Sequence, residues 1–158
     1  MKKFRNLIFI GLFYTLINSC TGYEPVFSSK NLQFQINDYE INGDQIIGNK
    51  IFSRLNLLSK TDPSVKSVSL KINSTKTKNP TVKNSTGKIL EYKIIINSEI
   101  IINDFISGEK ILDQNFNSSL NYKVQNQYSD TINLENRSIE NLINNIYQKI
   151  LLVLSQKI

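Results

Sequence analysis

The chain lacks histidine, tryptophan and alanine altogether, and only one of its 158 residues is a cysteine. Without histidine, Ser-His-Asp triads, histidine-containing zinc sites and histidine acid–base pairs are excluded. A single cysteine excludes an internal disulfide and a CxxC redox or zinc pair. No GxSxG, phosphate-loop or dinucleotide-binding motif appears either. These absences predict that the protein is not an enzyme and that it holds no metal and no catalytic cofactor.

The acidic residues do not replace the missing catalytic groups. Glu99, Asp104, Glu109 and Asp113 are scattered around an expected hairpin, where we expect them to serve solubility. A carboxylate pair that acts on a sugar is the one catalytic alternative that these residue types leave open.

The longest hydrophobic run stands near the beginning of the chain. Met1 to Arg5 is a short basic segment, and the eleven residues from Leu7 to Ile17 are almost all apolar. Eleven residues rise about 16 Å in a helix, which is roughly half of a bilayer core. The run therefore predicts the hydrophobic part of a signal peptide, not a membrane span, and we expect residues 1–19 to be cleaved off.

The single cysteine follows this run directly. Ile17-Asn18-Ser19-Cys20 resembles a bacterial lipobox, in which a branched aliphatic residue and a small residue precede the cysteine. In such proteins the thiol receives a diacylglycerol, the leader is cut before the cysteine, and the new amine is acylated. Several acyl chains anchor a protein stably where one is marginal. We therefore expect Cys20 to carry the lipid and residues 20–31 to form an acylated tether.

The sequence leaves two alternatives to lipidation open: an uncleaved N-terminal anchor, and a chance cysteine in an ordinary signal peptide. If Cys20 is lipidated, the residue after it bears on the destination. An aspartate there is the usual signal for retention in the inner membrane of many Gram-negative bacteria, and here the residue is Thr21. The outer membrane is therefore the expected location.

Hydrophobic periodicity predicts the first elements of the remaining chain. Residues 32–36 alternate between apolar and polar and predict a short strand. A helical period follows, with Asn42 or Asp44 as the expected N-cap and Asp62-Pro63 at the end of the segment. The apolar face of this helix consists of Ile47, Ile51, Leu55 and Leu58, and Gly48 lowers its helix propensity.

Three further strands are predicted. The first covers Val68, Leu70 and Ile72, and a Thr-, Lys- and Asn-rich loop is expected from Ser74 to Lys88. Two longer strands follow, separated by a turn at Ser107-Gly108. Their apolar faces consist of Leu90, Tyr92, Ile94, Ile96, Ile100 and Ile102, and of Leu112, Phe116, Leu120, Tyr122 and Val124. Polar residues fill the alternate positions, which is typical of an antiparallel sheet covered on one side only.

The last segment predicts the longest helix. Its apolar stripe consists of Ile139, Leu142, Ile143, Ile146, Ile150, Val153 and Leu154. The order β-α-β-β-β-α predicts a single α+β domain over residues 32–158, a two-layer sandwich with two helices on one face of a four-stranded, mostly antiparallel sheet. The initial β-α-β unit favours a parallel pair between the first strand and a later one.

These features together resemble one family. The lipobox cysteine, the sequence GYEPVF at residues 22–27 and the element order are similar to the LPS-assembly lipoproteins (LptE), particularly their alphaproteobacterial branch. Two departures are visible: Thr21 stands where the family usually has Gly directly after Cys, and the family's Ala-rich helices are replaced by Ile and Asn.

The resemblance implies a function. It implies a lipoprotein on the periplasmic side of the outer membrane that assists the assembly of the LptD β-barrel, plugs it, and binds lipopolysaccharide during transport to the outer leaflet. The expected partners are therefore LptD, lipopolysaccharide and the outer membrane, with no nucleic acid.

The distribution of charge offers a candidate site for an anionic glycolipid. Between Lys60 and Lys93 there are eight lysines and two acidic residues. We expect Lys76, Lys78, Lys83 and Lys88 to contact lipopolysaccharide phosphates, because lysine supplies a point charge to phosphate. The alternative is a solvated loop whose lysines keep the sheet edges apart. Likewise, the polar face of the sheet either hydrogen-bonds to a barrel wall or to sugar, or is simply its wet side.

Two other functions remain compatible with the sequence. One is an auxiliary lipoprotein of an ABC-type lipid or solute transporter, which would also carry a small domain on a lipid tether. The other is a peptidoglycan-facing or purely structural lipoprotein without a lipid ligand. A nucleic-acid-binding loop is discarded, because residues 75–85 contain neither aromatics nor arginines.

Overall fold

Four strands and two helices make up the computed structural model, which describes residue 32, residues 34–60 and residues 64–157. They follow in the order β1 (Phe34–Gly43), α2 (Gln45–Asn56), β2 (Lys66–Lys83), β3 (Ile89–Asp104), β4 (Lys110–Lys123) and α3 (Tyr128–Leu154). The predicted signal peptide, Cys20 and the tether lie outside the described residues. No helix in the described part of the chain has the length and apolar character needed to cross a bilayer.

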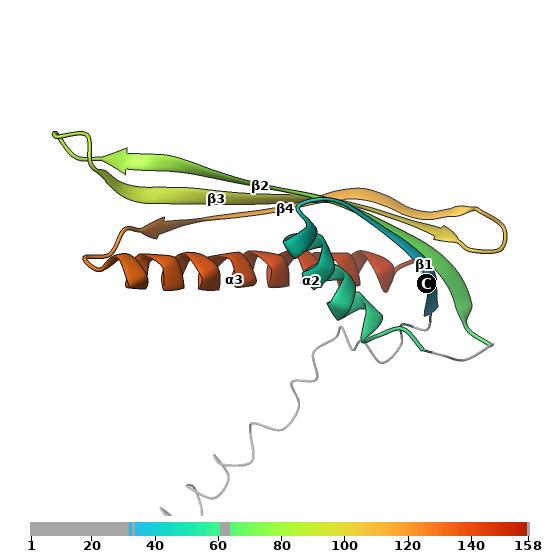
Figure 1. The fold of residues 1–158 in the computed structure, drawn as a ribbon. Helices are drawn as coiled ribbons and strands as arrows, with labels where there is room; N and C mark the ends of the chain where they lie inside the picture. The colour runs from blue at the N-terminus through green and yellow to red at the C-terminus, as the bar shows by residue number, and fades with distance from the viewer. Residues whose placement is uncertain (1–31, 33, 61–63, 158) are drawn as a thin grey trace, which may run out of the picture.

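The strands form a single mixed sheet in the order β1-β2-β3-β4. β1 and β2 are parallel, and the pairs β2–β3 and β3–β4 are antiparallel. Both helices lie on the same face of this sheet, as Figure 1 shows. The predicted fold class, a two-layer α+β sandwich, is confirmed, and so is the parallel pairing of the first strand with a later one.

The core lies between the sheet and the two helices. Its sheet side is made of alternate residues of β2, β3 and β4, and its helix side is made of one stripe on each helix. Burying one such side chain completely stabilises the fold by about 1.5–3 kcal/mol. The most deeply buried members are Ile72, Ile94, Ile96 and Ile100 on the strands, Ile47 and Ile51 on α2, and Leu142, Ile143, Ile146 and Ile150 on α3.

The start of α2 is fixed by its N-cap and by two glycines. Asp44 is the N-cap, as one of the two predictions had it, and its carboxylate accepts a hydrogen bond from the Ile47 N–H at 3.2 Å. Gly43 has φ +75°, and a Cβ there would collide with the backbone oxygen of Ser74. A Cβ on Gly48 would likewise overlap the Cγ2 of Ile41, so this glycine lets α2 approach the sheet closely.

α3 is longer than its predicted apolar stripe. It begins at Tyr128, eleven residues before Ile139, and its first turns bury Thr131 and Ser138 in place of large apolar side chains. The hydrophobic pattern is weak there because this part of the helix runs beside the end of the sheet and lines a hollow described below.

The expected loop from Ser74 to Lys88 is wrong. β2 continues to Lys83, in register with β3, and only residues 84–88 form the turn between them. The sequence misled because Lys, Asn and Pro are depleted in strands. They are tolerated here because β1 ends opposite Ser74, so the rest of β2 is a sheet edge. Pro80 lies on this edge, next to a register shift, where its missing N–H costs no ladder hydrogen bond.

We expect Gly48→Ala to destabilise the protein. Alanine gains about 1 kcal/mol of helix propensity over glycine. The overlap with Ile41 outweighs this gain, because overpacking of a well-packed core costs about 1–3 kcal/mol. Urea unfolding of the single variants and of the double variant with Ile41→Ala measures the effect. The cost of Gly48→Ala should largely vanish in the Ile41→Ala background, and an equal cost in both backgrounds would contradict the contact.

Candidate functional site

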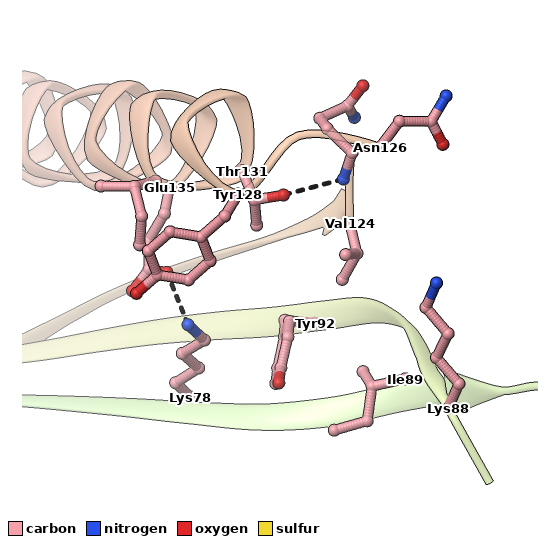
Figure 2. Close-up of a pocket in the computed structure, with 11 residues that line it drawn as sticks. Lys78, Lys88, Ile89, Tyr92, Val124, Asn126, Tyr128, Thr131 and Glu135 are labelled. Carbon is pink, nitrogen blue, oxygen red and sulfur yellow. Dashed lines mark hydrogen bonds and ion pairs between the residues drawn. The ribbon is translucent and has the colours of Figure 1, made fainter.

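A hollow of about 490 Å³ lies at the end of the molecule where the β2–β3 turn faces the N-terminus of α3. We refer to it as the hairpin-end pocket. β2 and β3 contribute Lys78, Lys88, Ile89 and Tyr92, the first turns of α3 contribute Tyr128, Thr131, Ile132 and Glu135, and residues 124–126 close it from the segment between β4 and α3. Its lining is thus about equally apolar and polar, as Figure 2 shows for the labelled side chains.

An ion pair crosses the inner side of this pocket. Lys78 of β2 places its Nζ 2.5 Å from Oε2 of Glu135 on α3, and the hydroxyl of Tyr122 on β4 donates to the same oxygen at 2.7 Å. The ammonium also lies over the ring of Tyr92, 4.4 Å from its centre, which favours the cation further. Side chains of β2 and β4 therefore meet at this one carboxylate of α3, and Tyr92 of β3 contacts the ammonium.

The surroundings fix the protonation states of the pair. Burial by itself lowers the pKa of Lys78, but the hydrogen bonds to Glu135 and Tyr122 raise it more, and the pKa reaches about 12. Burial raises the pKa of Glu135, but the hydrogen bonds from Lys78 and Tyr122 lower it below its ordinary value. Both groups are therefore charged across the physiological pH range.

The outer side of the pocket differs, because its cation has no partner. Among the described residues no side chain pairs with the Nζ of Lys88, which Figure 2 shows extending from the hairpin toward residues 124–126. Ile89 and Val124 line the pocket on this side, and Tyr128, which is 80% exposed, lies on the side of Glu135, as Figure 2 shows. The arrangement offers an unpaired positive charge beside an exposed apolar surface, which suits an anionic amphiphile.

The four predicted lysines do not form one cluster. Lys78 and Lys88 both line the hairpin-end pocket, whereas Lys76 points toward α2 and lies 3.9 Å from Asp44. Lys83 is exposed at the end of β2. Lys76 and Lys78 share the helix-facing side of the sheet with Ile72 and Ser74, at an edge strand. Charges that point inward at an edge hinder the association of one strand with another. The solvated-loop alternative assigned this role to all four lysines.

Several pocket residues were not predicted as site residues. Tyr92 and Tyr122 were assigned to the apolar strand faces, which is correct, but their ring contacts with Lys78 depend on the unexpected length of β2. Glu135 lies before the predicted apolar stripe of α3, and nothing in its spacing indicates that it faces β2. The sequence carried no signal for this pairing.

The uncovered face of the sheet is polar, as predicted. Rows of small polar residues cross it, such as Thr75, Asn97 and Asn117, which are direct neighbours on β2, β3 and β4. Within the described ranges, no group of three or more acidic, histidine or cysteine side chains is placed to hold a metal ion.

Comparison with known proteins adds information about the fold. No family model and no curated protein matches this chain. Lipoprotein B from Nitrosomonas europaea, itself uncharacterised, matches with a TM-score of 0.57 at 11% identity, over 82% of this chain and 88% of that protein. A candidate lipoprotein from Caulobacter crescentus gives a TM-score of 0.55 at 13% identity, over 78% and 88%. A minor lipoprotein from Acinetobacter baumannii gives 0.50 at 14% identity, over 78% and 90%.

At these identities the likeness shows the fold alone. The class that it defines is a small two-layer α+β domain, and each of the three solved proteins carries the word lipoprotein in its name. The matches cover 88–90% of those chains, so the shared fold includes both helices and the sheet.

The Lys78–Glu135 pair predicts a specific loss of stability in acid. Because the folded pKa of Glu135 is lowered, its contribution is present above the ordinary carboxyl pKa and is lost as the pH falls through the folded pKa. Glu135→Gln should lower the free energy of unfolding by about 1 kcal/mol at neutral pH, since the pair is partly solvated. It should also flatten the decline below about pH 4.5. Urea unfolding across pH 3–7 measures both effects.

Glu109→Gln is the matched control, because its carboxylate is exposed in the β3–β4 turn and pairs with no side chain in the described part of the chain. This variant should keep the parent's pH profile. Equal profiles for Glu135→Gln and the parent would show that the ion pair does not contribute to folding.

Proposed function

We propose that the protein is a lipoprotein of the outer membrane, anchored through acyl chains on Cys20, and that it acts as an LptE-type subunit of a lipopolysaccharide translocon. In this role it assists the assembly of the LptD β-barrel, occupies its lumen and contacts lipopolysaccharide. The lipobox at residues 17–20 and the sequence at residues 22–27 support the anchor and the family. The fold that it shares with proteins named as lipoproteins is consistent with both.

The observation that supports lipopolysaccharide as the ligand is the arrangement of side chains on the outer side of the hairpin-end pocket. Lipopolysaccharide joins phosphate groups to acyl chains, so a site for it needs cationic and apolar surface side by side. Lys88 supplies an ammonium without a carboxylate partner in the described structure, and Ile89 and Val124 supply apolar surface on the same side. Tyr128 adds apolar surface on the side of Glu135. Lys78 contributes less, since Glu135 already neutralises it.

The polar face of the sheet supports the contact with a barrel. A barrel lumen is lined by polar side chains, because lumen-facing and lipid-facing residues alternate along each strand. Thr75, Asn97 and Asn117 present both donors and acceptors and carry no charge, so this row of the face loses little desolvation energy against such a wall. Charged side chains, such as Lys93 and Glu99, lie on the same face.

We expect Lys88→Gln to weaken lipopolysaccharide binding by about fivefold, equivalent to ~1 kcal/mol for a partly solvated charge contact. Isothermal titration calorimetry with purified lipopolysaccharide, in detergent below its critical micelle concentration, measures the affinity. The difference between the variants should disappear when dephosphorylated lipopolysaccharide is used, because the lost contact is to phosphate.

Two control variants separate this site from general charge. Lys93→Gln removes one charge from the opposite face of β3, and the double variant Lys76→Gln with Lys83→Gln removes the two predicted lysines outside the pocket. Both should bind nearly as well as the parent. If all three variants lose affinity equally, the effect is electrostatic and unspecific, and the pocket is not the site.

The partner is tested by purifying the mature protein from detergent-solubilised membranes. We expect a large β-barrel protein to co-purify in a stoichiometric amount, and we expect Cys20→Ser to abolish both acylation and membrane attachment. Recovery of an inner-membrane permease in place of a barrel would favour the transporter lipoprotein and overturn the proposal. Mass spectrometry of the amino terminus tests the acyl chains directly.

A further inference from the structure

Two large apolar side chains project from the turn between β3 and β4, at the end of the molecule opposite the hairpin-end pocket. Ile106 is 89% exposed and Phe105 is 49% exposed. Neighbouring residues of this kind on a turn are costly in water and indicate a contact that buries them. We call residues 105 and 106 the apolar tip.

The tip is held in place by a hydrogen-bonded turn. The carboxylate of Asp104 accepts from the N–H groups of Ile106 at 3.0 Å and Ser107 at 2.9 Å. The N–H of Asp104 donates to the backbone carbonyl oxygen of Glu109 at 2.8 Å, and Gly108 takes the positive φ of +72° that closes the turn. The backbone is therefore satisfied with both apolar side chains outside, so their exposure is a feature of the folded turn.

The tip lies close to the start of β1. The N–H of Phe105 donates to the oxygen of Ser67 at 2.9 Å, and Ser67 pairs with Gln35 at the start of β1. Two strand spacings, roughly 10 Å, thus separate the tip from the first residues of β1. Leu32, which precedes them, is buried in the core and fixes the chain at this end.

An anchor on Cys20 places the bilayer nearest this end. Eleven residues lie between Cys20 and Leu32, and the twelve steps of the chain span at most about 43 Å. The molecule is longer than this, since the 18 residues of β2 alone extend over ~60 Å. The tether therefore keeps the Leu32 end within its own reach of the bilayer, whereas the pocket end can lie a further molecular length away.

The charges around the tip are largely paired. Lys66 lies 3.7 Å from Asp104, and Lys110 lies 2.6 Å from Asp113. Glu109 is the exception, since its exposed carboxylate has no side-chain partner in the described part of the chain. The turn therefore carries no net positive charge to attract an anionic lipid surface, and a contact with lipid would depend on Phe105 and Ile106. Such a contact would be nearly independent of salt.

We propose that, before the domain enters a barrel, the apolar tip inserts into the interfacial region of the bilayer that holds the acyl chains, so that the domain docks on the membrane in one orientation. The inference rests on the proposed lipid anchor and goes beyond the proposed function. The tip adds a second point of attachment to the anchor, and two attachments at one end restrict tilting of the domain as one tether does not.

The absence of tryptophan from the chain makes a direct test possible. Phe105→Trp introduces a single fluorescent reporter at the tip, and Tyr128→Trp introduces one at the hairpin-end pocket, at a position that is more exposed than Phe105. The full mature protein, its acylation verified by mass spectrometry, is reconstituted into phosphatidylethanolamine–phosphatidylglycerol vesicles with brominated acyl chains. We expect quenching of the Phe105→Trp variant to be at least threefold stronger than that of the Tyr128→Trp variant, and unchanged in high salt.

Two further substitutions identify the source of the quenching. In the Phe105→Trp background, Ile106→Ser should reduce it at least twofold, whereas Ile46→Ser, which alters a residue on α2 that is 68% exposed, should leave it unchanged. Equal quenching of both reporters in acylated protein would overturn the proposed insertion of the tip and would leave the proposed function unaffected. An unacylated Cys20 in the native protein would overturn the anchor, and the tip with it.

Discussion

The structure depends on the packing of α3 against the apolar face of β2, β3 and β4. β1 ends opposite Ser74, so beyond that row β2 is an edge strand. There α3 packs on one face of the β2–β3 hairpin, and β4 pairs with β3. An isolated hairpin is marginally stable in water, and this one carries lysines and a proline on its edge strand. Its outer half is held by the pairing of β3 with β4 and by the carboxylate of Glu135, which accepts hydrogen bonds from Lys78 and Tyr122 at once. The same carboxylate forms one wall of the hairpin-end pocket, so the shape of the candidate site and the stability of the hairpin have a common origin.

The elongated shape separates two kinds of surface. At the pocket end, the N-terminus of α3, Lys88 and exposed apolar groups converge. At the other end, the end of α3, the start of β1 and the β3–β4 turn lie together, and two exposed apolar side chains stand there among charges that are paired except for Glu109. The first surface suits an amphiphile with anionic groups, and the second suits a bilayer interface. The polar sheet face connects the two ends and carries charges of both signs, such as Lys93 and Glu99.

The sequence predicted the fold well and the site poorly, for physical reasons. Alternation in residues 89–104 and 110–123 and the stripe on α3 follow from burial on one side, which leaves a direct imprint on residue order. The outer half of β2 left no such imprint, because an edge strand pairs on one side only and tolerates Lys76, Lys78 and Pro80. The candidate site is assembled from that half-strand and the polar start of α3. It became visible only when the register placed Lys78 opposite Glu135, fifty-seven positions along the chain.

The parallel pairing of β1 with β2 has a mechanical consequence. β1 starts near Leu32 and runs toward the pocket end, so a pull applied at Leu32 and resisted at the far end acts along the strand axis. Such a load shears the hydrogen bonds between the two strands together and does not peel them apart one at a time. The outer edge of β1 shares part of the load, since its backbone is also bonded to Ser59 and Lys60. A domain tethered through its first strand in this geometry resists tension at the place where a tether would apply it.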